Sequence, residues 1–447
     1  MDRSPTRAIP LPGRTTLPWS GPWISPRSRP DWRAEPPWPR STAGSFADLF
    51  ALAGPALHLP RYPLYHPGEA RTGDYDYFFL RGERYLSCQA ARFLLFGGDF
   101  ITLADQAAVD LTADLSGFWN GFYREQFAGQ IGPILRYAGR TGYRERIAER
   151  PGLKVVSPHP FDSAQVPAGR YYLDDPSLTV RLNAKGFMHE LTHRTPRHQR
   201  LTPAAFAHGR WRKDWPLPFV VKLAEPAGGG DGVALCRREA DLREARRCFA
   251  GRPVKIEHYL QDIRNNYNVQ FQITPDGRLS YLGGSVQRVQ CGRYAGNYID
   301  LQWVPPPPVA AVCDRVARVG AALGWHGVCG LDLIEDGAGE VWLIDPNFRL
   351  NGSTPFFLLG DFLRTHHRRP HLSTGYFCYP GSPIEFFDCF RREILRRELV
   401  PVGAHYDPRE DGITRLYAAV VSDDDPQINE ARLRAFAARQ LCPGIGL

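Results

Sequence analysis

The chain has 447 residues, of which 43% are hydrophobic and 23% are charged, a composition typical of a globular protein of about three domains. No apolar run is long enough to span a bilayer and no signal-peptide core opens the chain, so we expect a cytoplasmic protein without a membrane partner. The nine cysteines show neither metal nor disulfide spacing, and the net charge of +8 comes from arginines interleaved with acids, which disfavours a nucleic-acid partner.

The predicted elements begin with an arm at residues 1–44, and a mixed α/β unit follows it at residues 45–175. Proline excludes regular structure from most of the arm, although its four tryptophans suggest that part of it packs on the body. In the α/β region, Arg92–Leu103 predicts two apolar strands joined at a Gly-Gly turn.

A short apolar strand, Phe219–Leu223, carries Lys222 and runs into a glycine-rich loop that contains Gly228, Gly229 and Gly230. Glycines let backbone N–H groups approach phosphate oxygens, and the lysine adds a compact positive charge. The alternative is a plain surface hairpin. Lysine is rare here, with only five among 55 basic residues, which makes Lys222 more conspicuous.

Two acids interrupt the apolar strands of a predicted hairpin. With its turn centred at 337–338, Asp332 lies opposite Leu343, and Asp345 lies diagonally on the same face. Because buried carboxylates need compensation, and Asn347 adds a further oxygen, the pattern predicts a Mg²⁺ site. The alternative is a pair of strand-edge acids that bind surface arginines.

A third feature is Val254–Leu260, in which Glu257 stands at a predicted connection between strands. An acid followed by apolar residues in such a connection can hold an adenine through backbone groups and ring packing. Alone, this feature does not distinguish a nucleotide hinge from an ordinary connection.

The order of glycine loop, acidic connection and acidic hairpin resembles the ATP-grasp superfamily of carboxylate–amine ligases over about residues 182–354. The resemblance implies an α+β fold, in which ATP-grasp subdomains at 181–260 and 261–359 grip ATP. It also implies an N-terminal α/β pre-ATP-grasp domain at 45–180 and a C-terminal α/β extension at 360–447. The layout is similar to that of peptide ligases of secondary metabolism.

The resemblance further implies the residues of the site. ATP would contact Lys185, Lys222, Gly228, Gly229, Gly230, Glu257, Tyr259, Leu260 and Asn266, the metal (Mg²⁺, or Mn²⁺ instead) would bind Asp332, Asp345 and Asn347, and Arg349 would face the reacting groups. We add Arg288, because a guanidinium after an apolar strand suits a carboxylate or phosphate. Two departures stand out: Asp345 replaces the usual glutamate, and Asn266 replaces the usual ribose-binding acid, so Asn265 and Asn268 are alternatives.

The implied reaction is ATP-dependent ligation, in which a small carboxylate (an amino acid or peptide) becomes an acyl phosphate and is then attacked by an amine. Natural-product biosynthesis is the expected setting, and a homodimer is compatible with the sequence. A catalytically silent nucleotide-binding scaffold and an ATP-grasp kinase are the alternatives.

Overall fold

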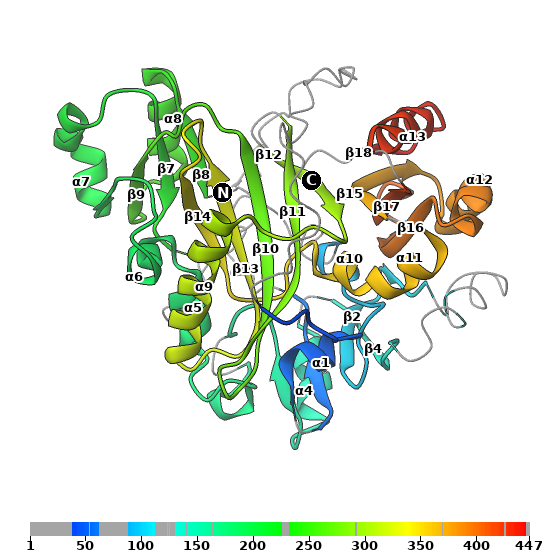
Figure 1. Ribbon diagram of the computed structural model, residues 1–447. Helices are drawn as coiled ribbons and strands as arrows, with labels where there is room; N and C mark the ends of the chain where they lie inside the picture. The colour runs from blue at the N-terminus through cyan, green and yellow to red at the C-terminus, as the bar shows by residue number, and fades with distance from the viewer. Residues whose placement is uncertain are drawn as a thin grey trace, which may run out of the picture.

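Three sheets organise the chain in the computed structural model (Figure 1), which describes residues 38–52, 54–61, 88–111, 123, 125, 130–139, 141–161, 165–225, 232–290, 293–368, 370–423 and 426–443. Most of the arm at 1–44, and Gly228, Gly229 and Gly230, lie outside these ranges. Within the ranges, no helix is long and apolar enough to cross a membrane, and none of the eight cysteines forms a disulfide.

The first sheet is parallel, with the order β4-β2-β1-β5, and consists of β1 (Ala56–His58), β2 (Ile101–Asp105), β4 (Ile134–Tyr137) and β5 (Lys154–Val156). The accompanying helices are α1 (Phe46–Phe50), α4 (Tyr143–Ala148) and the 3-10 helix η1 (Ala168–Arg170). The strand predicted at the start of Arg92–Leu103 is wrong, because a helical turn at 88–91 leads into turns and only β2 is extended. A short apolar run that is buried on all sides carries no period to reveal its conformation.

The second sheet is antiparallel, with the order β6-β9-β7-β8. Its elements are β6 (His198–Leu201), α7 (Pro203–His208), η3 (Arg210–Asp214), β7 (Phe219–Leu223), β8 (Val233–Cys236), α8 (Glu239–Cys248) and β9 (Val254–His258). One face packs on a small core that includes Trp211, Phe219 and Leu242. The opposite face carries lysines and turns toward the third sheet, from which this lobe stands apart in Figure 1.

The third sheet has ten strands and contains the chain's main core. Its strands follow the order β14-β13-β10-β11-β12-β15-β17-β16-β3, and β18 also pairs with β15. One half of the sheet consists of β10 (Asn265–Ile273), β11 (Leu279–Gln290), β12 (Arg293–Asp300), β13 (Gly327–Glu335) and the edge strand β14 (Val341–Asn347). The other half consists of β3 (Ala108–Val109), β15 (His371–Pro380), β16 (Leu399–His405), β17 (Ile413–Ser422) and β18 (Cys442–Pro443). Because β12 pairs with β15, the C-terminal strands continue the sheet of the preceding region.

Helices cover this large sheet and join it to the other two sheets. They are α5 (Ser177–Asn183), η2 (Lys185–Phe187), α6 (Met188–Leu191), α9 (Pro307–Ala322), α10 (Thr354–Leu358), α11 (Gly360–His366), α12 (Pro383–Leu395) and α13 (Pro426–Ala438). The amphipathic α9 buries Val309, Val312 and Val316. The arm's last residues also join the core, since Trp38 packs on Phe271 and donates from Nε1 to Asp314 Oδ1 at 2.9 Å.

Candidate functional site

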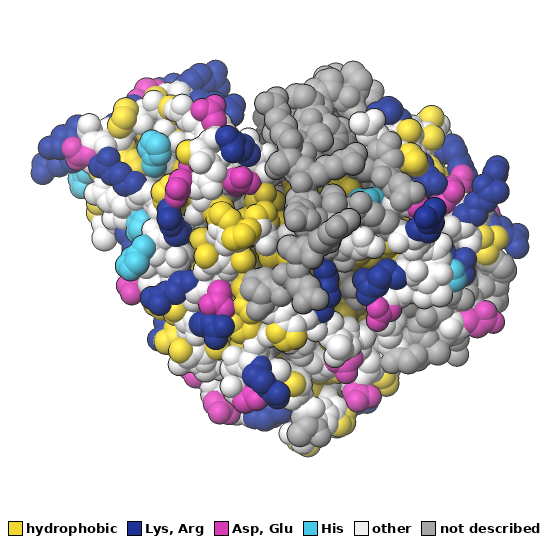
Figure 2. Space-filling model, viewed as in Figure 1, with side chains coloured by type: hydrophobic (Ala, Val, Ile, Leu, Met, Phe, Trp, Pro, Cys, Tyr) yellow, Lys and Arg dark blue, Asp and Glu magenta, His cyan; other side chains and the backbone are white. Residues whose placement is uncertain are grey.

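The lysine-bearing face of the second sheet meets the β13–β14 hairpin of the large sheet. Two lysines span the junction: Lys222 Nζ donates to the Ile344 carbonyl at 2.9 Å, and Lys185 Nζ lies 3.0 Å from Asp345 Oδ1. Both lysine side chains are buried. Basic groups on the visible surface, in contrast, are spread over both lobes among acids (Figure 2), so the rare buried lysines mark the site better than the net charge does.

The hairpin register differs from the sequence-based expectation. Asp332 pairs directly with Asp345, whereas we predicted that Leu343 would lie opposite Asp332. The connection is one residue longer than assumed, and a β-bulge places Ile344 as an extra residue between the paired positions. The correction brings the two acids closer together than the predicted diagonal arrangement.

The bulge also explains how the two sheets are joined. An extra residue interrupts the ladder and leaves its backbone groups available for other partners. Here the Ile344 carbonyl accepts the bond from Lys222, and the neighbouring Leu343 N–H donates to the Arg194 carbonyl at 2.8 Å. The β-bulge at Ile344 therefore positions β7, which carries Lys222, against the two acids.

Amide side chains surround Asp332. Asn268 Nδ2 donates to its Oδ1 at 2.7 Å, and Asn347 Nδ2 lies 3.3 Å from its Oδ2. Burial and the neighbouring Asp345 charge nonetheless raise the pKa of Asp332 to about 6. Two facing carboxylates with a nearby amide provide oxygen ligands of the kind that Mg²⁺ prefers. A bound Mg²⁺ would offset the repulsion between the two carboxylates. Such a ligand set also leaves coordination positions for phosphate oxygens. No cluster of three His, Cys, Asp or Glu occurs in the described ranges.

A buried polar network supports these ligands from behind. Gln270 Nε2 donates to Asn268 Oδ1 at 2.8 Å and to Ser353 Oγ at 2.7 Å, and Thr354 Oγ1 donates to Gln270 Oε1 at 2.7 Å. Because each amide is engaged, Asn268 is fixed with its N–H toward Asp332. Sequence reasoning missed Gln270 and Ser353, although polar residues at alternate positions of a buried strand were a signal for them.

The lysine side of the site contains a buried triad. The two carboxylate oxygens of Glu257 lie 2.6 Å from Lys222 Nζ and 2.7 Å from Lys255 Nζ. Burial by itself would raise the pKa of Glu257, but the two ammonium groups hold it below its ordinary value. Burial lowers the pKa of Lys255, whose side chain is completely enclosed. Sequence reasoning missed Lys255; it is the third of only five lysines to lie at this junction.

The predicted adenine hinge is only partly a connection. Glu257 lies within β9, where we expected it between strands, and Tyr259 and Leu260 follow the end of that strand. On β10, Asn266 lies on the same face as Asn268, which bonds to Asp332, because side chains alternate. Asn265 lies on the other face and donates to Glu335 Oε2 at 2.8 Å. Asn265 and Asn268 are thus engaged with carboxylates, and Asn266 stays the predicted ribose contact.

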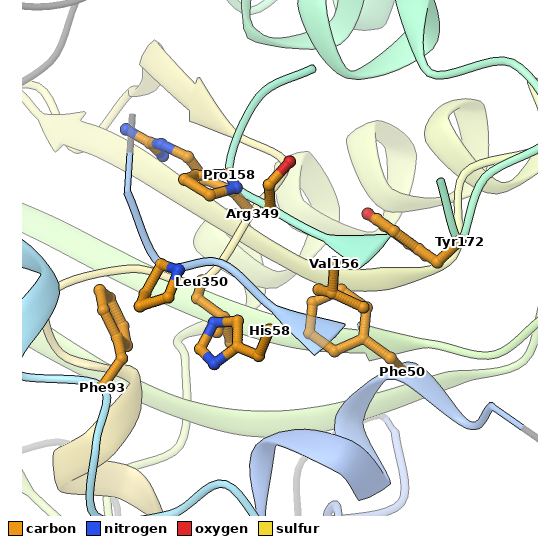
Figure 3. A pocket seen from close by; sticks show the side chains of 10 residues that line it. Phe50, His58, Phe93, Val156, Pro158, Tyr172, Arg349 and Leu350 are labelled. Carbon is orange, nitrogen blue, oxygen red and sulfur yellow. The ribbon is translucent and has the colours of Figure 1, made fainter. Parts of the chain in front are cut away.

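Arg349 lines a small cavity between the large sheet and the parallel sheet (Figure 3). The other walls come mostly from the ends of β1 and β5 and from the chain after β14, and the lining includes Phe50, His58, Phe93, Val156, Tyr172 and Leu350. Burial lowers the pKa of His58 to about 3, so this imidazole is neutral at physiological pH. Arg349 is therefore the permanent cation of the cavity.

Arg288 lies on β11, away from the acid hairpin strands. Its Nη2 is 3.8 Å from Glu430 Oε1 on α13, and both side chains are largely buried. Burial lowers the pKa of this arginine. The structure thus pairs Arg288 with the C-terminal region, and its role toward a substrate stays a prediction.

A family model matches the segment that contains most of this geometry. Residues 196–347 match the family model described as "L-aspartate--L-methionine ligase, ATP grasp". This stretch contains the lysine strand, the buried triad and the acid hairpin. The match confirms that the chain carries an ATP-grasp domain of carboxylate–amine ligase type, as the order of sequence motifs predicted.

Solved structures confirm the ATP-grasp fold over most of the chain. N5-carboxyaminoimidazole synthetase from Staphylococcus aureus, complexed with ADP, aligns with a TM-score of 0.53 at 10% identity, covering 88% of this chain and 99% of the other. The ADP complex of purK, an N5-carboxyaminoimidazole ribonucleotide synthetase, gives 0.51 at 11% identity, covering 76% and 91%. The Aspergillus clavatus enzyme with ADP and its aminoimidazole ribonucleotide gives 0.51 at 13% identity, with the same coverage.

Proposed function

We propose that this chain uses the ATP-grasp domain to join a small carboxylate to an amine at the expense of ATP. The observation that carries the proposal is the junction of two oppositely charged walls. Lys222 and Lys255 share the single acid Glu257 on one wall, and Asp332 and Asp345 face each other on the other wall. A nucleotide triphosphate with its metal has the charges that complement both walls.

Asp332, Asp345 and Asn347 would hold Mg²⁺, with Mn²⁺ as the alternative ion, and the bound ion would supply charge neutralisation for phosphoryl transfer. In the structure, Lys185 binds Asp345. We propose that Lys185 exchanges this carboxylate for a phosphate oxygen when the nucleotide binds. Glu257 and the Ile344 carbonyl hold the ammonium group of Lys222 in position. Lys222 would therefore contact the phosphate without moving.

The reaction then needs few protein groups. The substrate carboxylate attacks the γ-phosphorus of ATP, the bond to the β–γ bridging oxygen breaks, and ADP leaves. An amine attacks the acyl carbon, and phosphate departs. Arg349 would stabilise the negative charge on the acyl phosphate and on the tetrahedral oxyanion, since a guanidinium offers paired donors. The predicted loop with Gly228, Gly229 and Gly230 would exclude water from the acyl phosphate.

For the substrates, we propose an amino acid or peptide as the carboxylate and a second small molecule as the amine. The matching family is described as a ligase of two amino acids, and the motif order resembles that of peptide ligases. The same resemblance supports a role in natural-product biosynthesis. Roles for Tyr259, Leu260 and Asn266 at the adenosine and for Arg288 at a substrate belong to the same proposal.

The test is phosphate release from Mg²⁺·ATP in the presence of pairwise mixtures of the twenty amino acids, with mass spectrometry of the products. We expect phosphate release that depends on specific mixtures and equals the amount of a new amide. Nucleotide binding without turnover across the panel would instead support the silent scaffold. A phosphorylated product without an amide would support the kinase.

A further inference from the structure

Arg92 is a buried arginine outside the junction of the lysines and the acid hairpin. It directly follows the helical turn at 88–91, and only 8% of its surface is exposed. Its guanidinium lies over two aromatic rings, 4.7 Å from the centroid of Phe93 and 5.3 Å from that of Tyr417. Its buried Nε has no hydrogen-bond acceptor, and no ion pair to Arg92 occurs in the described part of the chain.

Such a group is unusual because enclosing a charge is costly unless an opposite charge compensates it. Aromatic rings recover only part of this cost. Two other buried arginines have a carboxylate, since Arg252 lies 2.7 Å from Glu225 and Arg415 pairs with Asp411. A guanidinium without such a carboxylate is a candidate binding group for an anion.

Two glycines lie close to Arg92, one beside its guanidinium and one beside its backbone. A Cβ atom on Gly352 would lie 2.7 Å from Arg92 Nη1, and one on Gly403 would lie 2.6 Å from Arg92 Cα. A side chain at either glycine would therefore collide with Arg92. The two glycines belong to the loop after β14 and to β16, so three regions of the chain meet at this residue.

Arg92 is also connected to the proposed reaction site. Gly352 precedes Ser353, whose Oγ donates to Asn268 Oδ1 at 3.1 Å, and Asn268 in turn donates to Asp332. Phe93, which follows Arg92 in the chain, lines the cavity of Arg349 (Figure 3). The guanidinium thus abuts the same short loop that carries Arg349.

We propose that Arg92 binds a substrate carboxylate, one that is not phosphorylated in the reaction. The inference rests on the proposed ligase function and specifies its substrate class. The lysines and the acid hairpin already complement the triphosphate, and a single planar guanidinium matches one carboxylate through paired hydrogen bonds. The bound group is either the free carboxylate of the amine substrate or a second carboxylate on the activated substrate.

The test compares the wild type with Arg92→Gln and Arg92→Lys, using the amino-acid pair that gives the highest phosphate release. We expect Arg92→Gln to raise the KM of one substrate by about 10- to 100-fold, the effect of losing a hydrogen bond between charged groups. The KM for ATP should stay unchanged, and Arg92→Lys should retain part of the affinity. The substrate whose KM rises identifies the source of the carboxylate.

A selectivity measurement separates binding from a packing role. Each candidate carboxylate is replaced by its carboxamide in turn, leaving the other substrate intact. The wild type should prefer the acid, and Arg92→Gln should lose most of that preference, because a neutral amide side chain pairs with an amide as well as with a carboxylate. Gly352→Ala, which displaces the guanidinium, should weaken the same substrate without affecting ATP.

The matched control is Arg246→Gln, because Arg246 also lies over an aromatic ring, that of Trp211, and its Nε also has no acceptor, but it belongs to α8. This variant should leave both KM values and the acid preference unchanged. An unaltered acid preference in a folded Arg92→Gln enzyme overturns the proposal.

If no amino-acid pair supports turnover by the wild type, the proposed function fails separately. The inference about Arg92 is then decided by thermal stabilisation with single amino acids and their amides. Stabilisation by an acid that is lost in Arg92→Gln supports the site. Equal responses of wild type and variant refute it.

Discussion

The two walls of the site balance their charges differently. On the lysine wall, Glu257 lies between Lys222 and Lys255, and all three side chains are almost fully enclosed. On the acid wall, Asp332 and Asp345 face each other across a hairpin and are only partly buried. Amide side chains bind Asp332, and Lys185 binds Asp345. The lysine wall is therefore preassembled, whereas the acid wall contains a repulsion that a bound cation would remove.

This difference separates two kinds of contribution. Removing an acid from the acid wall should affect chemistry much more than folding, because the repulsion in the folded protein falls as well. Removing the acid from the lysine wall should affect folding strongly, because two ammonium groups would then lie buried without their shared counter-charge. Single-residue variants distinguish these two contributions.

The largest effect on activity is expected for Asp345→Asn. The substitution removes one of two facing carboxylates but keeps its shape, so phosphate release should fall by at least about 100-fold, a loss typical of essential metal ligands. The melting temperature should fall less than in Glu257→Gln, because Lys185 loses its carboxylate partner while the repulsion with Asp332 is removed as well. Asp276→Asn, in the exposed turn between β10 and β11, is the control; near-wild-type turnover of Asp345→Asn would contradict the metal assignment.

A large loss is also expected for Lys222→Arg. The guanidinium is bulkier than the ammonium group, which fits between Glu257 and the Ile344 carbonyl at 2.6 and 2.9 Å. We expect a 10- to 100-fold decrease in kcat/KM for ATP, roughly the value of a charge-assisted contact. Unchanged steady-state kinetics would show that Lys222 does not contact phosphate.

Stability should respond most to Glu257→Gln. Removing the charge that Lys222 and Lys255 share should lower the free energy of unfolding by about 3–5 kcal/mol, as measured by urea denaturation. Lys255→Met leaves the bond between Glu257 and Lys222 intact and should cost less. A reversed order of the two variants would show that Glu257 is not the centre of the triad.

The same triad predicts a pH dependence of stability. Because the pKa of Glu257 is lower in the folded protein than its ordinary value of about 4.5, its ionised form contributes stability above that value. The contribution is lost as pH falls through the folded pKa. The stability difference between wild type and Glu257→Gln should thus be constant from about pH 7 to 5 and shrink below about pH 4.5; a difference that grows on acidification contradicts the lowered pKa.

The smallest of these effects is expected for Ser353→Ala. Ser353 holds Gln270 and Asn268 in place but does not touch the proposed ligands. Loss of such a supporting bond typically weakens metal affinity by about 10-fold or more, so the Mg²⁺ concentration for half-maximal activity should rise. Saturating Mg²⁺ should restore turnover; a lost kcat that Mg²⁺ does not restore would place Ser353 in the reaction itself.

Local patterns were sufficient to predict most of the fold. The strand with Lys222 was predicted with its observed bounds, and the acid hairpin was placed correctly because its strands are apolar and its turn is polar. The predicted strand at the start of Arg92–Leu103 was wrong, because full burial leaves no alternation to read. The order of the motifs, rather than any one of them, indicated the family.

Contacts between distant segments could not be predicted. The bulge at Ile344 depends on Lys222 and Arg194, which bind the backbone of the hairpin from another sheet. The pairing of Lys255 with Glu257 needs the curvature and enclosure of the second sheet, and nothing in the local pattern distinguishes Lys255 from a surface lysine. Continuation of the large sheet into the C-terminal strands likewise depends on the pairing of β12 with β15.

The most direct test of the proposed chemistry follows an oxygen atom. The active amino-acid pair is supplied with ¹⁸O in the carboxylate groups, and the phosphate released from ATP is analysed by mass spectrometry. Attack of a carboxylate on the γ-phosphate transfers one carboxylate oxygen, so the account predicts phosphate that carries one ¹⁸O atom in the same amount as the amide. Phosphate that acquires its oxygen only from water would contradict the account.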